Sequence, residues 1–277
     1  MKLKWGYEIS NEDRKRIEKD LFTDKVYIKL NENEPYFADN EKILEGFSDL
    51  DDLYRCGVAF AYISKKTLSN NKNKRTSLKC KPTGFPTKNE ESKNERLVFQ
   101  RCHLIGHQLF VKKNDKDNNK GANLKRIFTG TRFMNNVMFY YEKKIAKHVD
   151  NPENHVLYRV TPYFEGDNKL VYGVQMEAMF FNRIGKEDKN SSFNIFVYNK
   201  QPCVKINYET GKVLLEKMSN EEPNYVIDKK KNKYHIKGCA SIWDFDQDRT
   251  SDSLKKSEVL KEGIYHPCGI CDLGIKE

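Results

Sequence analysis

One short run of the sequence combines residue types that can do chemistry, Gln100-Arg101-Cys102-His103-Leu104-Ile105-Gly106-His107. An apolar stretch, Leu97-Val98-Phe99, predicts a strand that delivers Arg101 and His103 to the point where the hydrophobic alternation stops. A neutral histidine can accept a proton from water near neutral pH while a neighbouring arginine binds an anion. This pairing suits the cleavage of a phosphodiester bond.

Two other kinds of site are tested against the same residues. His103 and His107 have the i, i+4 spacing of a zinc protease, but Leu104 stands where that motif requires glutamate. Cys102 and His103 cannot form a nucleophile–base pair, because neighbouring side chains on a strand point to opposite faces. For an isolated histidine a packed, hydrogen-bonded role is favoured, and we expect that role for His107.

A helix with candidate metal ligands follows this run. From Arg132 to Val149, apolar residues recur at three- and four-residue steps, which predicts a helix. Asn135 and Glu142 are seven residues apart, two helical turns, and so project from one face. An amide oxygen and a carboxylate can bind one Mg²⁺ or Mn²⁺, with water and substrate oxygen as its other ligands. Asn136 is an alternative ligand.

The C-terminal segment contains a second metal-binding pattern. Three residues separate His235 from Cys239, and two separate Cys268 from Cys271. Three thiolates and one imidazole in two pairs match a tetrahedral zinc site, with His266 as a competing ligand. Because a segment of about 50 residues buries too little surface to fold securely alone, we expect this Zn²⁺ to be structural.

Length and charge set broader limits. The chain of 277 residues can bury a full core, and the polar stretch 217–224 predicts a linker between domains at 1–216 and 225–277. The chain has 50 Lys and Arg against 40 Asp and Glu, a net charge of +10. This positive charge fits a polyanionic partner and equally a solvated cationic surface. The same two alternatives hold for Lys72, Lys74 and Arg75 in the long connection 64–96.

The sequence also gives an expectation for location. The start, Met1-Lys2-Leu3-Lys4-Trp5-Gly6, has no apolar signal region, and no later stretch approaches roughly 18 uncharged apolar residues. The 7 cysteines are an odd number, and three of them lie in the zinc pattern, which favours a reducing compartment. We expect no export signal, no membrane span and a cytoplasmic protein.

The remaining elements are predicted from periodicity and turn residues. An amphipathic helix is expected at 10–22 and a short hairpin over 26–37. The apolar run within 47–63 predicts a buried strand in the middle of a sheet. Alternating runs in 156–164 and 169–178 predict a second hairpin, followed by strands at 193–198 and 204–208.

Three segments together resemble one known family. The run 100–109 resembles the Asp-Arg-Gly-His motif of the DNA/RNA non-specific endonucleases, the segment 79–85 resembles their Lys-Pro-Ser-Gly-Trp element, and 127–135 resembles their Thr-Gly-Thr-Arg stretch that ends in Asn. The resemblance runs from about residue 26 to about residue 213. The C-terminal segment resembles short His/Cys zinc domains of bacterial DNA-handling proteins and adaptive DNA-repair methyltransferases.

The sequence departs from the family pattern at three positions and in the length of one interval. Gln100 replaces the acid, Cys102 replaces the glycine, and Arg126 stands where many members have Asn. The interval from Asn135 to Glu142 is one residue shorter than in most relatives.

The resemblance implies a fold of α+β class, a ββα-metal (His-Me finger) nuclease with a central, mostly antiparallel sheet. It also implies sequence-non-specific hydrolysis of DNA, with RNA left open, to products with 5′ phosphate and 3′ hydroxyl. His103 is expected to be the general base, Arg101 and Arg132 to neutralise the non-bridging oxygens, and Mg²⁺ on Asn135 and Glu142 to stabilise the departing oxygen. Related nucleases are often exported or surface-anchored.

Two rival functions remain open. One is a nucleic-acid-binding protein whose nuclease site has decayed, for which the departures at Gln100 and Cys102 are the support. The other is an antibacterial effector toxin that uses the same chemistry and is held silent by an immunity or inhibitor protein.

Overall fold

The computed structural model describes residues 9–21, 23, 25–37, 46–68, 80–87, 93–109, 124–202, 204–215, 225–236, 239–242, 254–261 and 263–271. Lys72, Lys74 and Arg75 and the predicted linker 217–224 lie outside these residues. None of the helices in the described ranges has both the length and the apolar character needed to cross a membrane.

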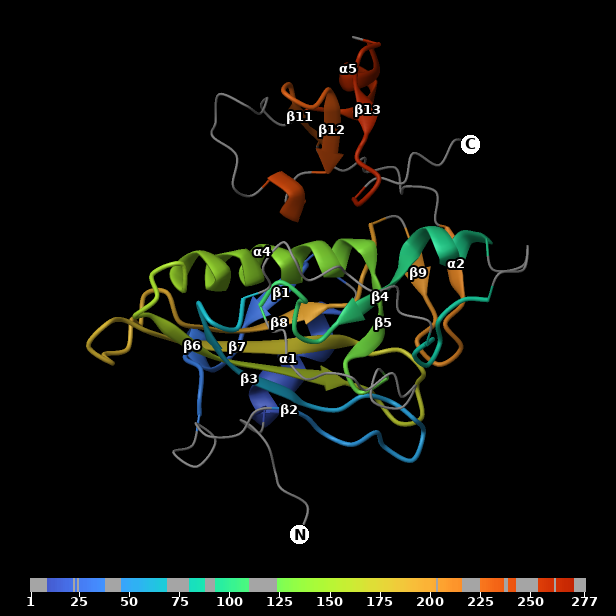
Figure 1. The fold of residues 1–277 in the computed structure, drawn as a ribbon. Helices are drawn as coiled ribbons and strands as arrows, with labels where there is room; N and C mark the ends of the chain where they lie inside the picture. Colours follow the sequence, from blue (N-terminus) through green and yellow to red (C-terminus); the bar gives the residue numbers. More distant parts are fainter. Residues whose placement is uncertain are drawn as a thin grey trace.

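A six-stranded antiparallel sheet forms the centre of the molecule (Figure 1). Its strand order is β1 (Tyr27–Lys29), β8 (Phe193–Tyr198), β7 (Gly173–Phe181), β6 (His155–Tyr163), β3 (Ala59–Ser64) and β2 (Gly46–Phe47). The central hairpin β6–β7 pairs residues from His155↔Phe181 to Tyr163↔Gly173, which confirms the second predicted hairpin. The mixed architecture with a central antiparallel sheet confirms the predicted α+β class.

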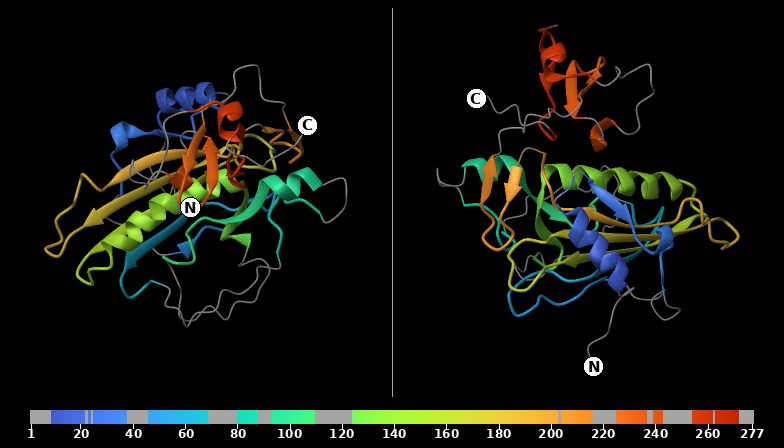
Figure 2. Two further views of the ribbon diagram at one scale, coloured as in Figure 1. Left: turned by 90° about the horizontal axis from the view of Figure 1, so that it is seen from above. Right: turned by 180° about the vertical axis from the view of Figure 1, so that it is seen from behind.

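Helices cover both faces of this sheet. Side chains of β8 point alternately to one face and to the other, so the strand packs against a different helix on each face. Ile195 and Val197 pack in the core that includes α4 (Arg132–His148), whereas Phe196 and Tyr198 pack with Ile17 of α1 (Asn11–Asp20). Figure 2 shows α1 on the side of the sheet opposite α4. The structure thus confirms the predicted N-terminal helix, which Ser10 caps by accepting a hydrogen bond from Asp13 N at 3.0 Å.

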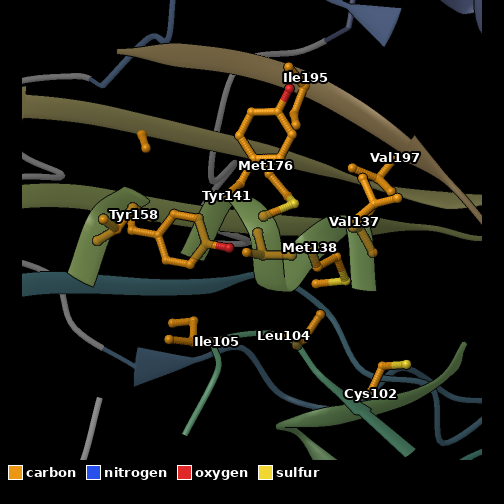
Figure 3. Packing of buried hydrophobic residues seen from close by; sticks show 14 of the residues in the cluster. Cys102, Leu104, Ile105, Val137, Met138, Tyr141, Tyr158, Met176, Ile195 and Val197 are labelled. Carbon is orange, nitrogen blue, oxygen red and sulfur yellow. The ribbon is translucent and has the colours of Figure 1, made fainter. Parts of the chain in front are cut away.

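A separate two-stranded ribbon leads into α4. β4 (Phe99–His103) pairs antiparallel with β5 (Ile127–Thr131), and α4 begins at the next residue, with Thr131 as its N-cap. Figure 3 shows Cys102, Leu104 and Ile105 of this region on the side of α4 that faces away from the sheet residues Met176, Ile195 and Val197. The helix is therefore apolar on two sides.

The first predicted hairpin, over 26–37, is wrong. β1 pairs with β8 instead, and Asn31–Asn33 form a 3₁₀ turn (η1) with positive φ angles of 45°, 53° and 72°. Tyr36 then uses its backbone groups on a buried ion pair: its N–H donates to Glu177 Oε1, and its carbonyl accepts from Arg159 Nη2. These bonds replace the ladder that a second strand would need.

Two further expectations are corrected by the structure. Leu97 and Val98 end a short helix, α2 (Lys93–Val98), so the strand that carries Arg101 and His103 begins only at Phe99. β3 is not in the middle of the sheet, because β6 and β7 occupy the centre and only the two-residue β2 lies outside β3. Sequence periodicity identifies a buried strand but not its place in the sheet order.

The C-terminal segment folds around a small sheet of its own. β12 (Lys233–Ile236) pairs antiparallel with β11 (Tyr225–Asp228) and parallel with β13 (His266–Pro267). A 3₁₀ turn, η4 (Ala240–Ile242), contacts α4 on the side away from the central sheet, and α5 (Lys256–Lys261) contacts β11 (Figures 1 and 2). A second ribbon, β9 (Val204–Ile206) with β10 (Val213–Leu215), lies beside α2. The domain division at 216 and 225 stays a prediction.

The β4–β5 ribbon yields a stability prediction. A Cβ added at Gly130 would stand 2.6 Å from Cys102 Sγ and 2.9 Å from Phe128 Cε2. We expect Gly130→Ala to lower the free energy of unfolding by about 1–3 kcal/mol. Cys102→Ala removes the closest atom, so the double variant should lose less than the sum of the single losses. Urea denaturation of the four proteins measures this coupling, and strictly additive losses would contradict the packing.

Candidate active site and metal-binding cluster

His103 is the last residue of β4 and lies opposite Ile127 of β5. The pairing continues one step further through Leu104 N, which donates to Arg126 O at 2.9 Å. Cys102 and Leu104 are fully buried, whereas Arg101 and His103 are half-buried. Strand alternation thus directs the cysteine into the core and leaves the histidine at a surface where substrate can reach it.

Arg101 is oriented by the segment 80–87. Its guanidinium carbon lies 5.4 Å from the centre of the Phe85 ring, and its Nη1 donates to Cys80 O at 3.5 Å. The segment is itself fixed to β5, because Thr129 Oγ1 donates to Thr83 O at 2.7 Å. A cation stacked on an aromatic face keeps its charge while losing freedom, which suits an anion ligand.

Asn135 faces the strand that carries His103. Its Nδ2 donates to Gln100 Oε1 at 3.1 Å, which leaves the amide oxygen as the group available to a hard cation. Gln100 precedes His103 by three residues, about 10 Å along an extended strand. The neighbouring Asn136 donates instead to Ser241 Oγ at 3.0 Å, in the C-terminal segment. The structure therefore favours Asn135 over Asn136.

Glu142 is buried beneath the loop that follows His103. Its Oε1 accepts a hydrogen bond from Gly106 N at 2.7 Å. Burial raises the pKa of this carboxyl to about 8, and the hydrogen bond from Gly106 opposes only part of the rise. Gly106 has no room for a side chain, because an added Cβ would collide with the carboxylate oxygens. Glu142 thus fixes the loop 104–109 against α4.

Arg132 lies at the other end of the ribbon from His103. It follows Thr131, which pairs with Phe99, and its Nε donates to Leu97 O at 2.7 Å. The structure does not bring Arg132 beside His103, and the hydrogen bond to Leu97 holds the end of α2 against the start of α4.

Sequence reasoning missed the residues that fix the start of α4. Asn199 Oδ1 accepts from Thr131 N at 2.8 Å, and Asn199 Nδ2 donates to Thr129 O at 3.2 Å and Val171 O at 3.0 Å. Thr131 Oγ1 donates to Lys200 O and accepts from Met134 N. The available signal was a polar run, Asn199-Lys200-Gln201, directly after an apolar strand.

The four predicted zinc ligands come together in the C-terminal segment. The ligand atoms of His235, Cys239, Cys268 and Cys271 all lie within 4.8 Å of one another, and all four residues are buried. Both ring nitrogens of His235 are buried and, among the described residues, have no hydrogen-bond partner. Zn–S bonds of about 2.3 Å place ligand atoms roughly 3.5–4 Å apart, so the donor set fits a zinc ion. His266 is exposed and lies outside the cluster.

Hydrogen bonds among the thiols of this cluster shift their pKa values. The pKa of Cys268 is held below its ordinary value because Cys239 and Cys271 hydrogen-bond to it. Ile236 N donates a hydrogen bond to Cys271 Sγ at 3.3 Å. Thiolate is the form that binds metal.

The β4–β5 ribbon and α4 form a β-β-α unit with a histidine at the end of its first strand. Residues 37–181 match the DNA/RNA non-specific endonuclease family, and this range is more than half of the 277 residues. The chain belongs to that family. The matched range contains His103, Asn135 and Glu142, whereas the His/Cys cluster lies beyond it.

Individual relatives agree with this assignment. A "Deoxyribonuclease" of Streptococcus dysgalactiae subsp. equisimilis is 29% identical over 128 residues, which are 46% of this chain and 36% of that protein. The chain therefore spans about a third of the length of that curated relative. NucA from Streptococcus agalactiae has a similar fold, with TM-scores of 0.55 for its magnesium-bound structure and 0.54 for its metal-free structure. In both comparisons the sequences are 20% identical and the superposition covers 75% of this chain. It covers 99% of the magnesium-bound NucA chain and 98% of the metal-free one.

The raised pKa of Glu142 predicts a pH-dependent stability. An unfolded glutamate ionises near pH 4.5, whereas this carboxyl keeps its proton to about pH 8 in the fold. Between these values the folded state binds more protons, so stability falls as the pH rises. Glu142→Gln stays neutral and keeps an acceptor for Gly106, so we expect it to be more stable than the native chain at pH 8 by roughly 1–3 kcal/mol and similar at pH 4.5.

Urea denaturation from pH 4.5 to 8.5 in buffer without magnesium measures this difference. Glu209→Gln, at an exposed glutamate, is the matched control and should follow the native curve. Parallel pH curves for Glu142→Gln and the native chain would contradict the prediction.

Proposed function

We propose that the chain is a metal-dependent endonuclease that hydrolyses phosphodiester bonds in DNA without sequence preference, with RNA as a second substrate to be tested. The observation that carries the proposal is the hydrogen bond from Asn135 to Gln100. It joins the helix with the candidate metal ligand to the strand that ends at the candidate base.

His103 is proposed as the general base. In its neutral form the imidazole takes a proton from a water aligned with phosphorus, which makes that water a stronger nucleophile. Arg101, oriented by Phe85, binds the non-bridging oxygens and stabilises the charge that develops on them. The expected products carry 5′ phosphate and 3′ hydroxyl. Contacts to phosphate carry no base information, which accounts for the lack of sequence preference.

Asn135 is proposed to hold one Mg²⁺ or Mn²⁺ through its amide oxygen. The ion, when bound, supplies positive charge that favours departure of the 3′ oxygen. Glu142, predicted as a second ligand, bonds to Gly106, and we propose that it acts by positioning the loop after His103. Arg132, predicted to contact phosphate, is assigned the role of joining α2 to α4.

The departures from the family motif do not favour a decayed site. Gln100 offers a carbonyl oxygen that accepts the bond from Asn135, so the amide replaces the acid as an acceptor. Cys102 fits because Gly130 on β5 leaves the space that its thiol fills. Both substitutions are accommodated by local contacts. The rival function, a protein that binds nucleic acid without cutting it, is tested by an activity assay.

We also propose that His235, Cys239, Cys268 and Cys271 hold a structural Zn²⁺ in a small unit at 225–277, separate from a nuclease domain at 1–216. The support is the buried cluster of four donors with the unpartnered nitrogens of His235. The apolar cluster of this unit is small, consisting among the described residues of Tyr225, Ile227, Tyr234 and Val259. Metal binding would supply the stability that so small a core lacks.

The role of His103 is tested by nicking of supercoiled plasmid in Mg²⁺. We expect His103→Ala to lose at least about a hundredfold in rate, the lower range for general-base catalysis, while its plasmid binding stays within a few-fold of the native chain. His107→Ala, the same change four residues along, is the matched control and should keep activity. Rapid nicking by His103→Ala would remove this residue from the role of base. A native chain that binds plasmid and leaves it supercoiled would establish the binding-protein rival.

The zinc assignment is tested by metal analysis. We expect Cys268→Ser to lose most of the bound zinc and to make the segment 225–271 susceptible to proteolysis before the nuclease domain. Cys56→Ser, at a buried cysteine outside the cluster, should keep the native zinc content. An unchanged zinc content in Cys268→Ser would refute the ligand set.

A further inference from the structure

Gln201 lies between the start of α4 and the His/Cys cluster. It is a buried residue with 3% exposure. Its Oε1 accepts from Phe133 N at 3.3 Å, and its Nε2 donates to Ile270 O at 2.5 Å. Both ends of one side-chain amide are therefore used, one on the nuclease core and one on the C-terminal segment.

The contact with Phe133 completes the first turn of α4. The first amides of a helix have no partner within the helix, so each needs an acceptor from outside. Thr131 supplies the acceptor for Met134 N, and Gln201 supplies it for Phe133 N. Asn135 lies two residues after Phe133 in the same turn. Gln201 therefore helps to hold the turn that carries the candidate metal ligand.

The contact with Ile270 depends on the His/Cys cluster. Ile270 lies between Cys268 and Cys271, so its carbonyl belongs to the short loop that a bound metal would wrap. Binding of two thiolates by one ion fixes the backbone between them. A bound metal would therefore fix the direction of this carbonyl, which is the acceptor for Gln201.

A second contact joins the cluster to α4 one residue beyond Asn135. Asn136 Nδ2 donates to Ser241 Oγ at 3.0 Å, and Ser241 lies in η4, two residues after Cys239. Ile242 and Ile270 pack against the same apolar core as Phe133 and Val137. The two halves of the cluster thus reach α4 on either side of Asn135.

We infer that Gln201 is a positioning residue through which the zinc cluster orients Asn135, so that occupancy of the cluster raises the affinity of the active site for Mg²⁺. This coupling rests on the proposed role of Asn135. Because coupling between two binding sites is reciprocal, Mg²⁺ should also make the zinc harder to remove.

The test changes one end of the amide at a time in the full chain. Gln201→Glu keeps an oxygen for Phe133 N and loses the donor to Ile270, whereas Gln201→Leu loses both contacts. We expect Gln201→Glu to weaken Mn²⁺ binding about tenfold and Gln201→Leu to weaken it further. Electron paramagnetic resonance of the bound Mn²⁺ measures this affinity. The Mg²⁺ concentration for half-maximal nicking should rise by the same factor, while the plasmid concentration for half-maximal rate is unchanged.

Gln175→Glu is the matched control. Gln175 is also buried, and its Nε2 donates to Asn194 Oδ1 within the central sheet, so the same change is made without touching α4. The control should keep the native Mn²⁺ affinity. Native Mn²⁺ affinity in folded, zinc-loaded Gln201→Glu would overturn the proposal, as would an equal loss in the control.

Hydrogen exchange separates this inference from the proposed function. Removal of zinc from the native chain should increase exchange at the amides of residues 133–137 more than at 145–148, the far end of α4. If this difference appears in a chain that does not cut plasmid, the linkage stands and the nuclease proposal fails. If the chain cuts plasmid and the two ends of α4 respond equally, the linkage fails and the nuclease proposal stands.

Discussion

The hydrogen bond between Asn135 and Gln100 is the contact on which the arrangement of the site depends. A helix that packs through apolar side chains can slide or rotate by a fraction of a turn with little change in buried area, because hydrophobic burial is not directional. One directional bond to the neighbouring strand removes that freedom. It therefore sets which residue of α4 faces Gln100 on the strand that carries His103.

The apolar surroundings of α4 explain why a few polar contacts are enough to fix the position of this helix. Val137 and Tyr141 pack in the apolar core with the central sheet, and Leu104 and Ile105 belong to the same core on the ribbon side (Figure 3). Three polar side chains of the helix form hydrogen bonds to other segments. Asn135 bonds to Gln100, Asn136 to Ser241 and Glu142 to Gly106. In a low-dielectric interior such bonds are costly to break, so they specify one register of the helix.

Elements with a strong local signal were predictable from the sequence. The 3.6-residue period gave α4, the turn residues gave the β6–β7 hairpin, and the two short spacings gave the four clustered donors. The pairing of β1 with β8 was not predictable, because its partner lies more than 160 residues away and nothing local in 26–37 opposes a hairpin. The contacts of Gln201 were hidden for the same reason: an isolated polar residue does not show which distant carbonyl it will meet.

The place of β8 in the sheet limits where the chain can be divided. The family match ends at residue 181, yet β8 lies between β1 and β7 and leads directly into Asn199, which bonds to the start of α4. The stretch that carries the motif residues is thus shorter than the unit that folds. A fragment that ended at residue 181 would retain every motif residue, yet it would leave β1 without its partner strand and the start of α4 without Asn199.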